Sequence, residues 1–255
     1  MPVLTAEGIC VAFGGVRALQ DVNVSLAVGG IYGLIGPNGA GKTTLFNVLT
    51  GVVASNSGSV VLSDIDITTL PPHRRARVGL SRTFQNLALF PSMTVEQNVT
   101  AGLLGKKHGS WVASMLGAGA LDAHGDRAVS DVLQHLGLEE YAALAVTALP
   151  LGTRKKVELA RAIVSRPKLL LLDEPAAGLS PEDIDALCGL VRWLQGSGTT
   201  VLIVEHHVAM VMSLCEHIFV LDFGTLIAQG SPSEIRQHPD VLKAYLGREA
   251  THETA

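Results

Sequence analysis

The sequence predicts an α/β fold with a mainly parallel sheet, and three observations support this. Short apolar runs bounded by turn residues, typical of buried strands, occur at 31–35, 169–172 and 199–204. Segments with helical spacing of apolar residues lie between these runs, and strands that alternate with helices form parallel sheets. A glycine cluster separates the first run from the helical segment TTLFNVLTG, which Gly51 closes as a helix-ending residue.

The later elements follow from the same periodicities. Ile184, Leu187, Cys188, Val191 and Leu194 recur as on one buried helix face, after the helix-starting pair Ser180 and Pro181. Residues 217–222 and 225–228 read as a hairpin with Phe-Gly between them, which adds antiparallel β elements to the sheet.

The middle of the chain differs, because 86–164 shows helical spacing and no convincing strand. We therefore expect one domain over 1–255, with an α/β core formed by 1–85 and 165–255 and an inserted α-helical subdomain at 86–164. Within the insert, the Gly/Ser/Ala-rich segment 105–119 predicts either a loop or a surface that meets an apolar partner.

Composition excludes several classes of protein. Among 255 residues, 47% are hydrophobic and 16% charged, so the chain is not disordered. A net charge of −4 gives no reason to expect a nucleic-acid partner, and three distant cysteines exclude a disulfide framework. No secretory signal or stretch of about 18 apolar residues is apparent, so we expect a soluble chain.

The strongest functional signal is a phosphate-binding loop that satisfies G-x-x-x-x-G-K-[ST] between a strand and a helix. Its residues are Gly36, Pro37, Asn38, Gly39, Ala40, Gly41, Lys42 and Thr43. Backbone amides and the helix N-terminus would face phosphate oxygens. Lys42 would reach the β- and γ-phosphates, and the Thr43 hydroxyl would bind Mg²⁺.

A second signal is the apolar run 169–172 that ends in Asp173 and Glu174, because the carboxyl ends of parallel strands form the ligand-binding edge. Asp173 would hold Mg²⁺, and Glu174 would deprotonate the attacking water. Together the two elements predict a P-loop nucleoside triphosphatase. No Asn-Lys pair of a guanine reader is present, which favours ATP.

With these motifs, residues 3–249 resemble the ATP-binding subunit of an ABC transporter. The resemblance assigns GPNGAGKTT, including Thr44, to the nucleotide. It implies that Gln85 touches Mg²⁺ and the attacking water, that His206 contacts the γ-phosphate, and that Phe13 stacks on adenine. In such dimers, ATP lies between the loop of one subunit and a signature segment of the other.

The signature segment departs from the family's Leu-Ser-Gly-Gly-Gln, because it reads Leu-Pro-Leu-Gly-Thr at 149–153. Gly152 keeps an amide for the phosphate, whereas Pro150 replaces a serine donor. We hypothesise that this segment serves its site less well than the standard sequence. Ser180 also stands where the family usually has aspartate, in the loop to which the family assigns communication between the two ATP sites.

The finer resemblance is to ATPases of branched-chain amino-acid uptake, through FGGVRALQDVN, SRTFQNLALFPSMTVEQNV, DEPAAGLSPED and HPDVLKAYLGRE. That branch often has L-x-x-G in its signature and includes importers of urea and short amides. It implies integral membrane permease subunits, a second ABC ATPase subunit in a hetero- or homodimer, an extracytoplasmic solute-binding protein and a peripheral place on the cytoplasmic face of the membrane. Lipopolysaccharide-export ATPases rank lower. A soluble ABC ATPase of nucleic-acid repair or translation, and a regulatory subunit with weak hydrolysis, remain alternatives.

Overall fold

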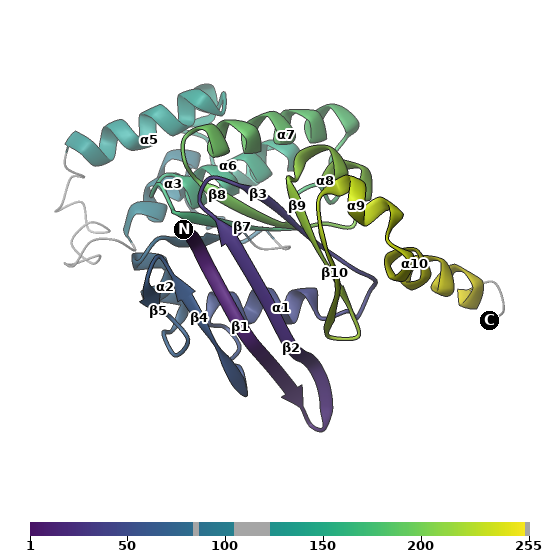
Figure 1. Ribbon diagram of the computed structural model, residues 1–255. Coiled ribbons are helices and arrows are strands. Elements are labelled where there is room, and N and C mark those ends of the chain that lie inside the picture. Colours follow the sequence, from purple (N-terminus) through teal and green to yellow (C-terminus); the bar gives the residue numbers. More distant parts are fainter. Residues whose placement is uncertain (84–86, 105–122, 253–255) are drawn as a thin grey trace.

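The computed structural model describes residues 1–83, 87–104 and 123–252, which form two sheets and a group of helices (Figure 1). A six-stranded sheet has the order β10-β9-β3-β8-β7-β6, and all neighbours are parallel except β10 and β9. Its strands are β3 (Ile31–Ile35), β6 (Leu80–Arg82), β7 (Leu169–Asp173), β8 (Thr200–Val204), β9 (His217–Asp222) and β10 (Thr225–Gly230). The predicted α/β class and mainly parallel sheet are confirmed.

An antiparallel sheet of order β2-β1-β4-β5 faces the first sheet. Its strands are β1 (Pro2–Phe13), β2 (Val16–Ala27), β4 (Ser57–Leu62) and β5 (Ile65–Asp66). Helix α1 (Lys42–Thr50) lies between the two sheets, and its apolar residues share one buried cluster with residues of β1, β2 and β7. In Figure 1 the long β1–β2 hairpin runs in front of α1.

Helices cover the other face of the six-stranded sheet and continue beyond its last strand. They are α3 (Val95–Leu104), α5 (Ala123–His135), α6 (Leu151–Ile163), α7 (Pro181–Gly196), α8 (Val208–Leu214), α9 (Pro232–Gln237) and α10 (Pro239–His252), with 3₁₀ turns η1 (Glu139–Tyr141) and η2 (Val146–Ala148). Helix α2 (Pro72–Arg77) lies instead beside the end of α1, where Arg75 donates to the carbonyl oxygens of Val48 and Leu49. Figure 1 shows α5, α6 and α7 above the sheets and α10 at the opposite end from α5. Described residues of 87–164 form only helices, turns and one isolated bridge, Thr94 to Ala145.

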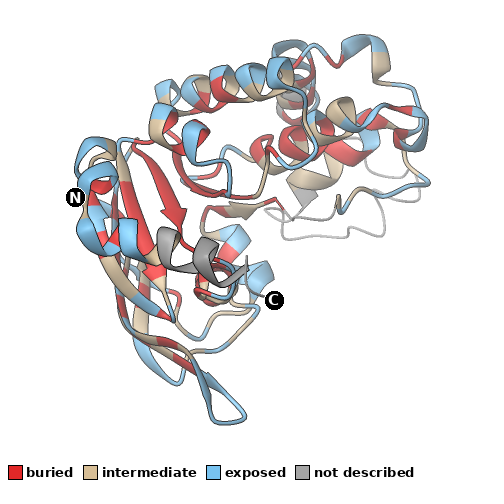
Figure 2. Cartoon of the chain, turned by 90° about the vertical axis from the view of Figure 1, so that its right-hand side faces the viewer, coloured by how far each residue is buried: buried red, intermediate tan, exposed pale blue. Residues whose placement is uncertain are grey.

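The core explains why the three apolar runs are strands. Alternate residues of β3 enter two different buried clusters: Ile31 and Ile35 face the helices, whereas Tyr32 and Leu34 face α1. Strands that are covered on both sides lose the usual alternation and read as continuous apolar runs. In Figure 2 the buried segments gather inside the molecule and the outer helix surfaces are exposed.

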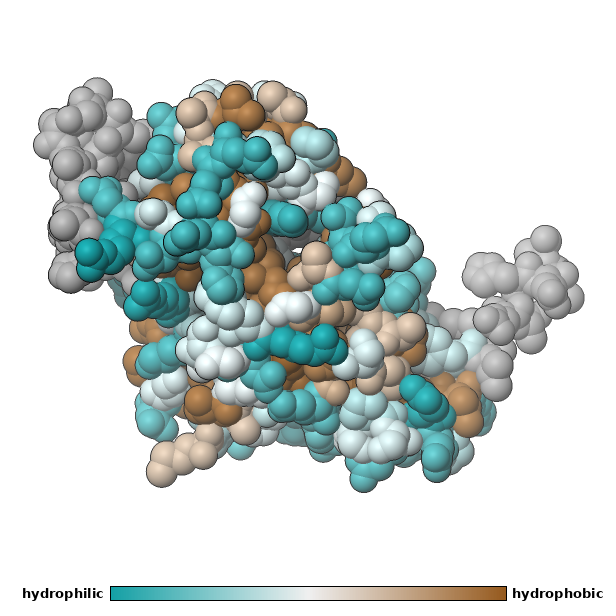
Figure 3. Space-filling model, turned by 90° about the horizontal axis from the view of Figure 1, so that it is seen from above, coloured by the Kyte–Doolittle hydropathy of each residue, from teal (hydrophilic) through white to brown (hydrophobic). Residues whose placement is uncertain are grey.

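None of the described helices is both long and apolar enough to cross a membrane. Seen from above in Figure 3, the surface carries hydrophilic residues among smaller apolar groups.

Candidate functional site

The phosphate-binding loop connects β3 to α1, and its shape depends on glycine. Gly36 has φ +150° and Gly41 has φ +103°, a region that L side chains rarely adopt. A Cβ atom on Gly36 would lie 2.1 Å from the Leu221 carbonyl oxygen, and one on Gly41 would lie 2.8 Å from the Ala18 carbonyl oxygen. Among the described residues no side chain caps the start of α1, and a helix N-terminus of this kind is suited to bind an anion.

Lys42 is folded against its own loop. Its ammonium nitrogen donates to the carbonyl oxygens of Gly36 at 2.7 Å and Pro37 at 3.0 Å, and the residue is 5% exposed. A triphosphate in the loop would offer charged oxygens in place of neutral carbonyls, and hydrogen bonds between charged groups are the stronger ones. Lys42 is therefore positioned to exchange two internal bonds for phosphate contacts.

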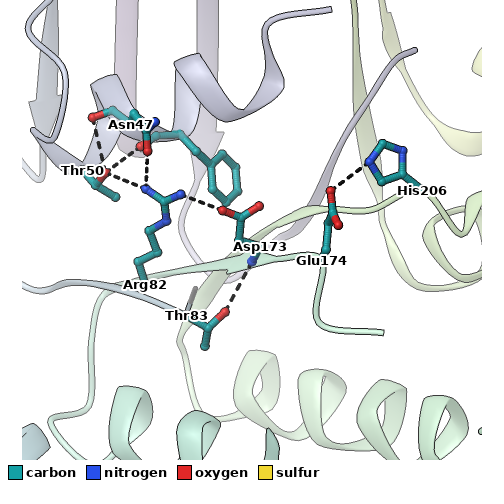
Figure 4. A network of polar contacts seen from close by, with 8 residues as sticks. Asn47, Thr50, Arg82, Thr83, Asp173, Glu174 and His206 are labelled. Atoms are coloured by element: carbon teal, nitrogen blue, oxygen red, sulfur yellow. Dashed lines mark hydrogen bonds and ion pairs between the residues drawn. The ribbon is translucent and has the colours of Figure 1, made fainter. Parts of the chain in front are cut away.

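Asp173 ends β7 with a fixed orientation (Figure 4). Its Oδ2 accepts from Arg82 Nη2 at 2.6 Å, and its backbone amide donates to Thr83 Oγ1 at 3.3 Å. Arg82 Nη1 donates to Asn47 at 2.7 Å and Thr50 at 3.1 Å, both on α1. Arg82 thus joins the strand that carries the acid to the helix that follows the phosphate loop.

The donor set fits a magnesium ion that arrives with its nucleotide. Throughout the described part of the chain, no group of three His, Cys, Asp or Glu residues is gathered to hold a metal. Arg82 takes one carboxylate oxygen of Asp173, which leaves the second for a cation or its water. Mg²⁺ is usually bound through one or two carboxylates plus substrate phosphates. Asp173 and the exposed Thr43 are the described residues that would hold it.

Glu174 and His206 meet at the sheet edge, where β7 and β8 end (Figure 4). His206 Nε2 lies 2.9 Å from Glu174 Oε1, with side-chain exposures of 46% and 18%. The Glu174 amide donates to the Val204 carbonyl oxygen at 2.9 Å, which ties the two strand ends together. A carboxylate that is partly open to solvent and paired with an imidazole can take a proton from water and pass it on.

The comparisons agree with this geometry. The model of the ABC transporter family matches residues 19–177, more than half of the chain. The chain belongs to the ABC transporter family. A second model, described as branched-chain amino acid ATP-binding cassette transporter, matches residues 225–251. Membership makes the chain a nucleotide-binding subunit that hydrolyses ATP.

Curated relatives of this ABC ATPase extend over nearly its whole length. BraF of Pseudomonas aeruginosa, a high-affinity branched-chain amino acid transport ATP-binding protein, is 38% identical over 96% of this chain and 98% of its own. LivG of Escherichia coli, of the same description, is 39% identical over 96% and 98%. LptB of E. coli, a lipopolysaccharide export system ATP-binding protein, is 36% identical over 98% and 99%.

Solved structures of the family share the fold. A nucleotide-free ATP-binding cassette of an ABC transporter superposes with a TM-score of 0.84 at 31% identity, covering 96% of this chain and 99% of that one. The ADP conformation of an ATP-binding cassette also gives 0.84 at 31% identity, over 97% and 99%.

Three predicted site residues of this ABC ATPase remain: Phe13, Gly152 and Gln85. Phe13 is the last residue of β1 and is 51% exposed. Stacking on a flat base requires such exposure. Gly152 lies in the first turn of α6, where an added Cβ would meet Asp183 Oδ2 at 3.2 Å. Its predicted target is the nucleotide of a second subunit. Gln85 falls outside the described residues, so its role stays a prediction.

Sequence reasoning missed three polar residues near the site: Arg82, Lys155 and Glu205. Arg82 lies in the segment SRTFQN. A charged residue in a segment that enters the core needs a partner of opposite charge, and this requirement was the available signal. Glu205 stands between the apolar run 199–204 and His206, and its signal is the same as that of Asp173: an acid at the carboxyl end of a buried strand, on the ligand-binding edge. Lys155 follows the signature segment without a local pattern.

Proposed function

We propose that this ABC ATPase energises an importer of branched-chain amino acids or of related small amides and urea. Two findings support the proposal: the match of residues 225–251 to the branched-chain amino acid cassette, and the transport role in the names of BraF and LivG. In this proposal the chain is peripheral at the cytoplasmic face of the membrane, bound to integral permease subunits and a second ATPase subunit. An extracytoplasmic solute-binding protein delivers the substrate.

The hydrolytic step is assigned to the residues at the sheet edge. The loop 36–44 and Lys42 bind the triphosphate, and Thr43 and Asp173 would hold a Mg²⁺ ion that would supply positive charge to the phosphate oxygens. Glu174 orients and deprotonates the attacking water. The single observation that carries this assignment is the 2.9 Å contact of His206 Nε2 with Glu174 Oε1, because His206 can then bridge the base and the γ-phosphate.

Energy coupling follows from differential affinity. ATP held between the loop of one subunit and Gly152 of the other stabilises a closed dimer more than ADP does, so hydrolysis and release reopen it. The permease subunits would follow this cycle.

Uptake by intact cells tests the proposal. In the source organism, deletion of the gene should abolish high-affinity uptake of labelled leucine, and wild-type protein but not Glu174→Gln should restore it. Loss of urea uptake alone would move the substrate to the amides. Unchanged uptake of both would contradict the proposal.

The 36% identity to LptB favours one competing function, lipopolysaccharide export. The same deletion strain distinguishes it, because defective export with normal leucine uptake would support this second candidate.

A further inference from the structure

Glu205 is a buried carboxylate that the hydrolytic assignment does not use. The residue follows β8, is 4% exposed, and accepts three backbone hydrogen bonds. Its Oε1 accepts from the Ala176 amide at 2.6 Å. Its Oε2 accepts from the amides of His206 at 3.0 Å and His207 at 3.3 Å. One side chain thus binds the backbone at His206 and the backbone just after Glu174.

The loop after Glu174 is also held from its other side. Lys155 of α6 donates from Nζ to the carbonyl oxygens of Pro175, at 2.9 Å, and Ala177. Burial lowers the pKa of Lys155, while the nearby charges of Glu205, Glu158 and Glu174 act in the opposite direction. Residues 175–177 are therefore clamped between a cation that binds carbonyls and an anion that binds an amide.

We propose that Glu205 is a positioning residue for ATP hydrolysis. Its carboxylate fixes the two backbone segments that carry Glu174 and His206, and thereby sets the 2.9 Å approach of His206 Nε2 to Glu174 Oε1. The inference rests on the roles proposed above for those two residues. Glu205 itself touches neither nucleotide nor water in this account.

The chemistry explains why an acid occupies this position. Three amide donors converge on two oxygens, and only an ionised carboxylate offers acceptors alone. Glutamine has the same shape, but its NH₂ group would face an amide donor. A buried carboxylate is costly unless it is hydrogen-bonded, so the site holds Glu205 through its three charge-assisted bonds.

Glu205→Gln in the full-length chain separates positioning from a purely structural role. The exposed Glu139→Gln serves as the matched control. Because the phosphate loop is untouched, Glu205→Gln should bind a fluorescent ATP analogue with Mg²⁺ at a Kd within about twofold of wild type, whereas kcat for phosphate release should fall at least about tenfold through misplacement of the reacting groups. Wild-type kcat, or a loss of binding equal to the loss of kcat, overturns the proposal.

A double-mutant cycle with His206→Ala tests whether Glu205 acts through His206. If it does, the combined loss of kcat should be smaller than the product of the two separate losses by at least about threefold. Fully multiplicative losses overturn the proposal.

A Glu205 variant that fails to fold also tests the proposal. Glu205→Asp keeps the charge with a shorter reach and should show the same split, with binding retained and kcat reduced. If neither variant of Glu205 folds, the residue is structural and the inference is wrong. Glu174→Gln, assayed in parallel, distinguishes failure of the proposed hydrolytic roles from failure of this inference. Wild-type turnover in Glu174→Gln would contradict the hydrolytic roles. Wild-type turnover in Glu205→Gln alone would contradict only the positioning role of Glu205.

Discussion

Arg82 and Asp173 form an ion pair of 2.6 Å at the end of β7, with side-chain exposures of 8% and 6%. The same guanidinium binds Asn47 and Thr50 of α1, and its Cζ lies 5.7 Å from the centre of the Phe46 ring. The residue that would hold Mg²⁺ and the helix that follows the phosphate loop are therefore connected by one side chain.

Arg82→Met should strongly destabilise the protein. The change leaves the Asp173 carboxylate buried without its counter-charge, and breaking such a pair costs about 3–5 kcal/mol. Chemical denaturation measures the free energy of unfolding. The exposed Arg236→Met is the control and should change it by less than about 0.5 kcal/mol. Equal stability of the two variants would show that the pair contributes nothing.

Lys42→Ala should weaken nucleotide binding at least about tenfold, because one charge-assisted hydrogen bond contributes about 1.5–3 kcal/mol. Titration with a fluorescent ATP analogue in the presence of Mg²⁺ measures this. The exposed Lys156→Ala serves as the control. Retained affinity in Lys42→Ala would mean that the lysine stays on the carbonyls of Gly36 and Pro37 when nucleotide binds.

The three cysteines should differ in reactivity. Burial raises the pKa of Cys215 to about 12 and also raises that of Cys188. Hydrogen bonds from Ser57 and the Asp21 backbone lower the pKa of Cys10. Since the thiolate is the nucleophile, its fraction at pH 8 is highest for Cys10 and lowest for Cys215. Iodoacetamide should modify Cys10 first in native protein and all three in urea, as peptide mass spectrometry would show. Rapid native modification of Cys215 would contradict the buried position.

Pro150→Ser should raise ATPase activity in the assembled transporter. Pro150 occupies the position before α6 with no side-chain cap, and a serine there would supply a hydroxyl for the facing γ-phosphate. Phosphate release at saturating ATP measures the effect. Unchanged or lower activity would show that the signature with proline serves its site fully.

Local features of the fold could be read from the sequence, and long-range ones could not. The strand 31–35 and the start of α7 at Ser180 were predictable because burial on both faces and helix capping leave local patterns; the Ser180 side chain accepts from the Asp183 amide. The β1–β2 pair went unrecognised because register shifts near Gly8, where φ is +62°, interrupt its alternation. Strand β6 has only three residues, too few for a period.

The residues of the site also differ in whether the sequence alone could predict them. The phosphate loop and Asp173-Glu174 were found because each is a contiguous motif. Arg82 and Asp173 are 91 positions apart, and Glu205 and Ala176 are 29 apart. Such pairs exist only once the sheet brings β6, β7 and β8 side by side, so no local pattern records them. The division of the chain at 86 and 164 stays a prediction.

The most direct test of the account compares Glu174→Gln with wild type in one experiment that records ATP-analogue binding and phosphate release. The variant keeps the loop 36–44 and Lys42, so its Kd should stay within about twofold, while loss of the base should lower phosphate release at least about 100-fold. The variant should also accumulate as an ATP-bound dimer. Phosphate release by Glu174→Gln at the wild-type rate, or an absence of nucleotide binding in the wild-type chain, would contradict the central claim.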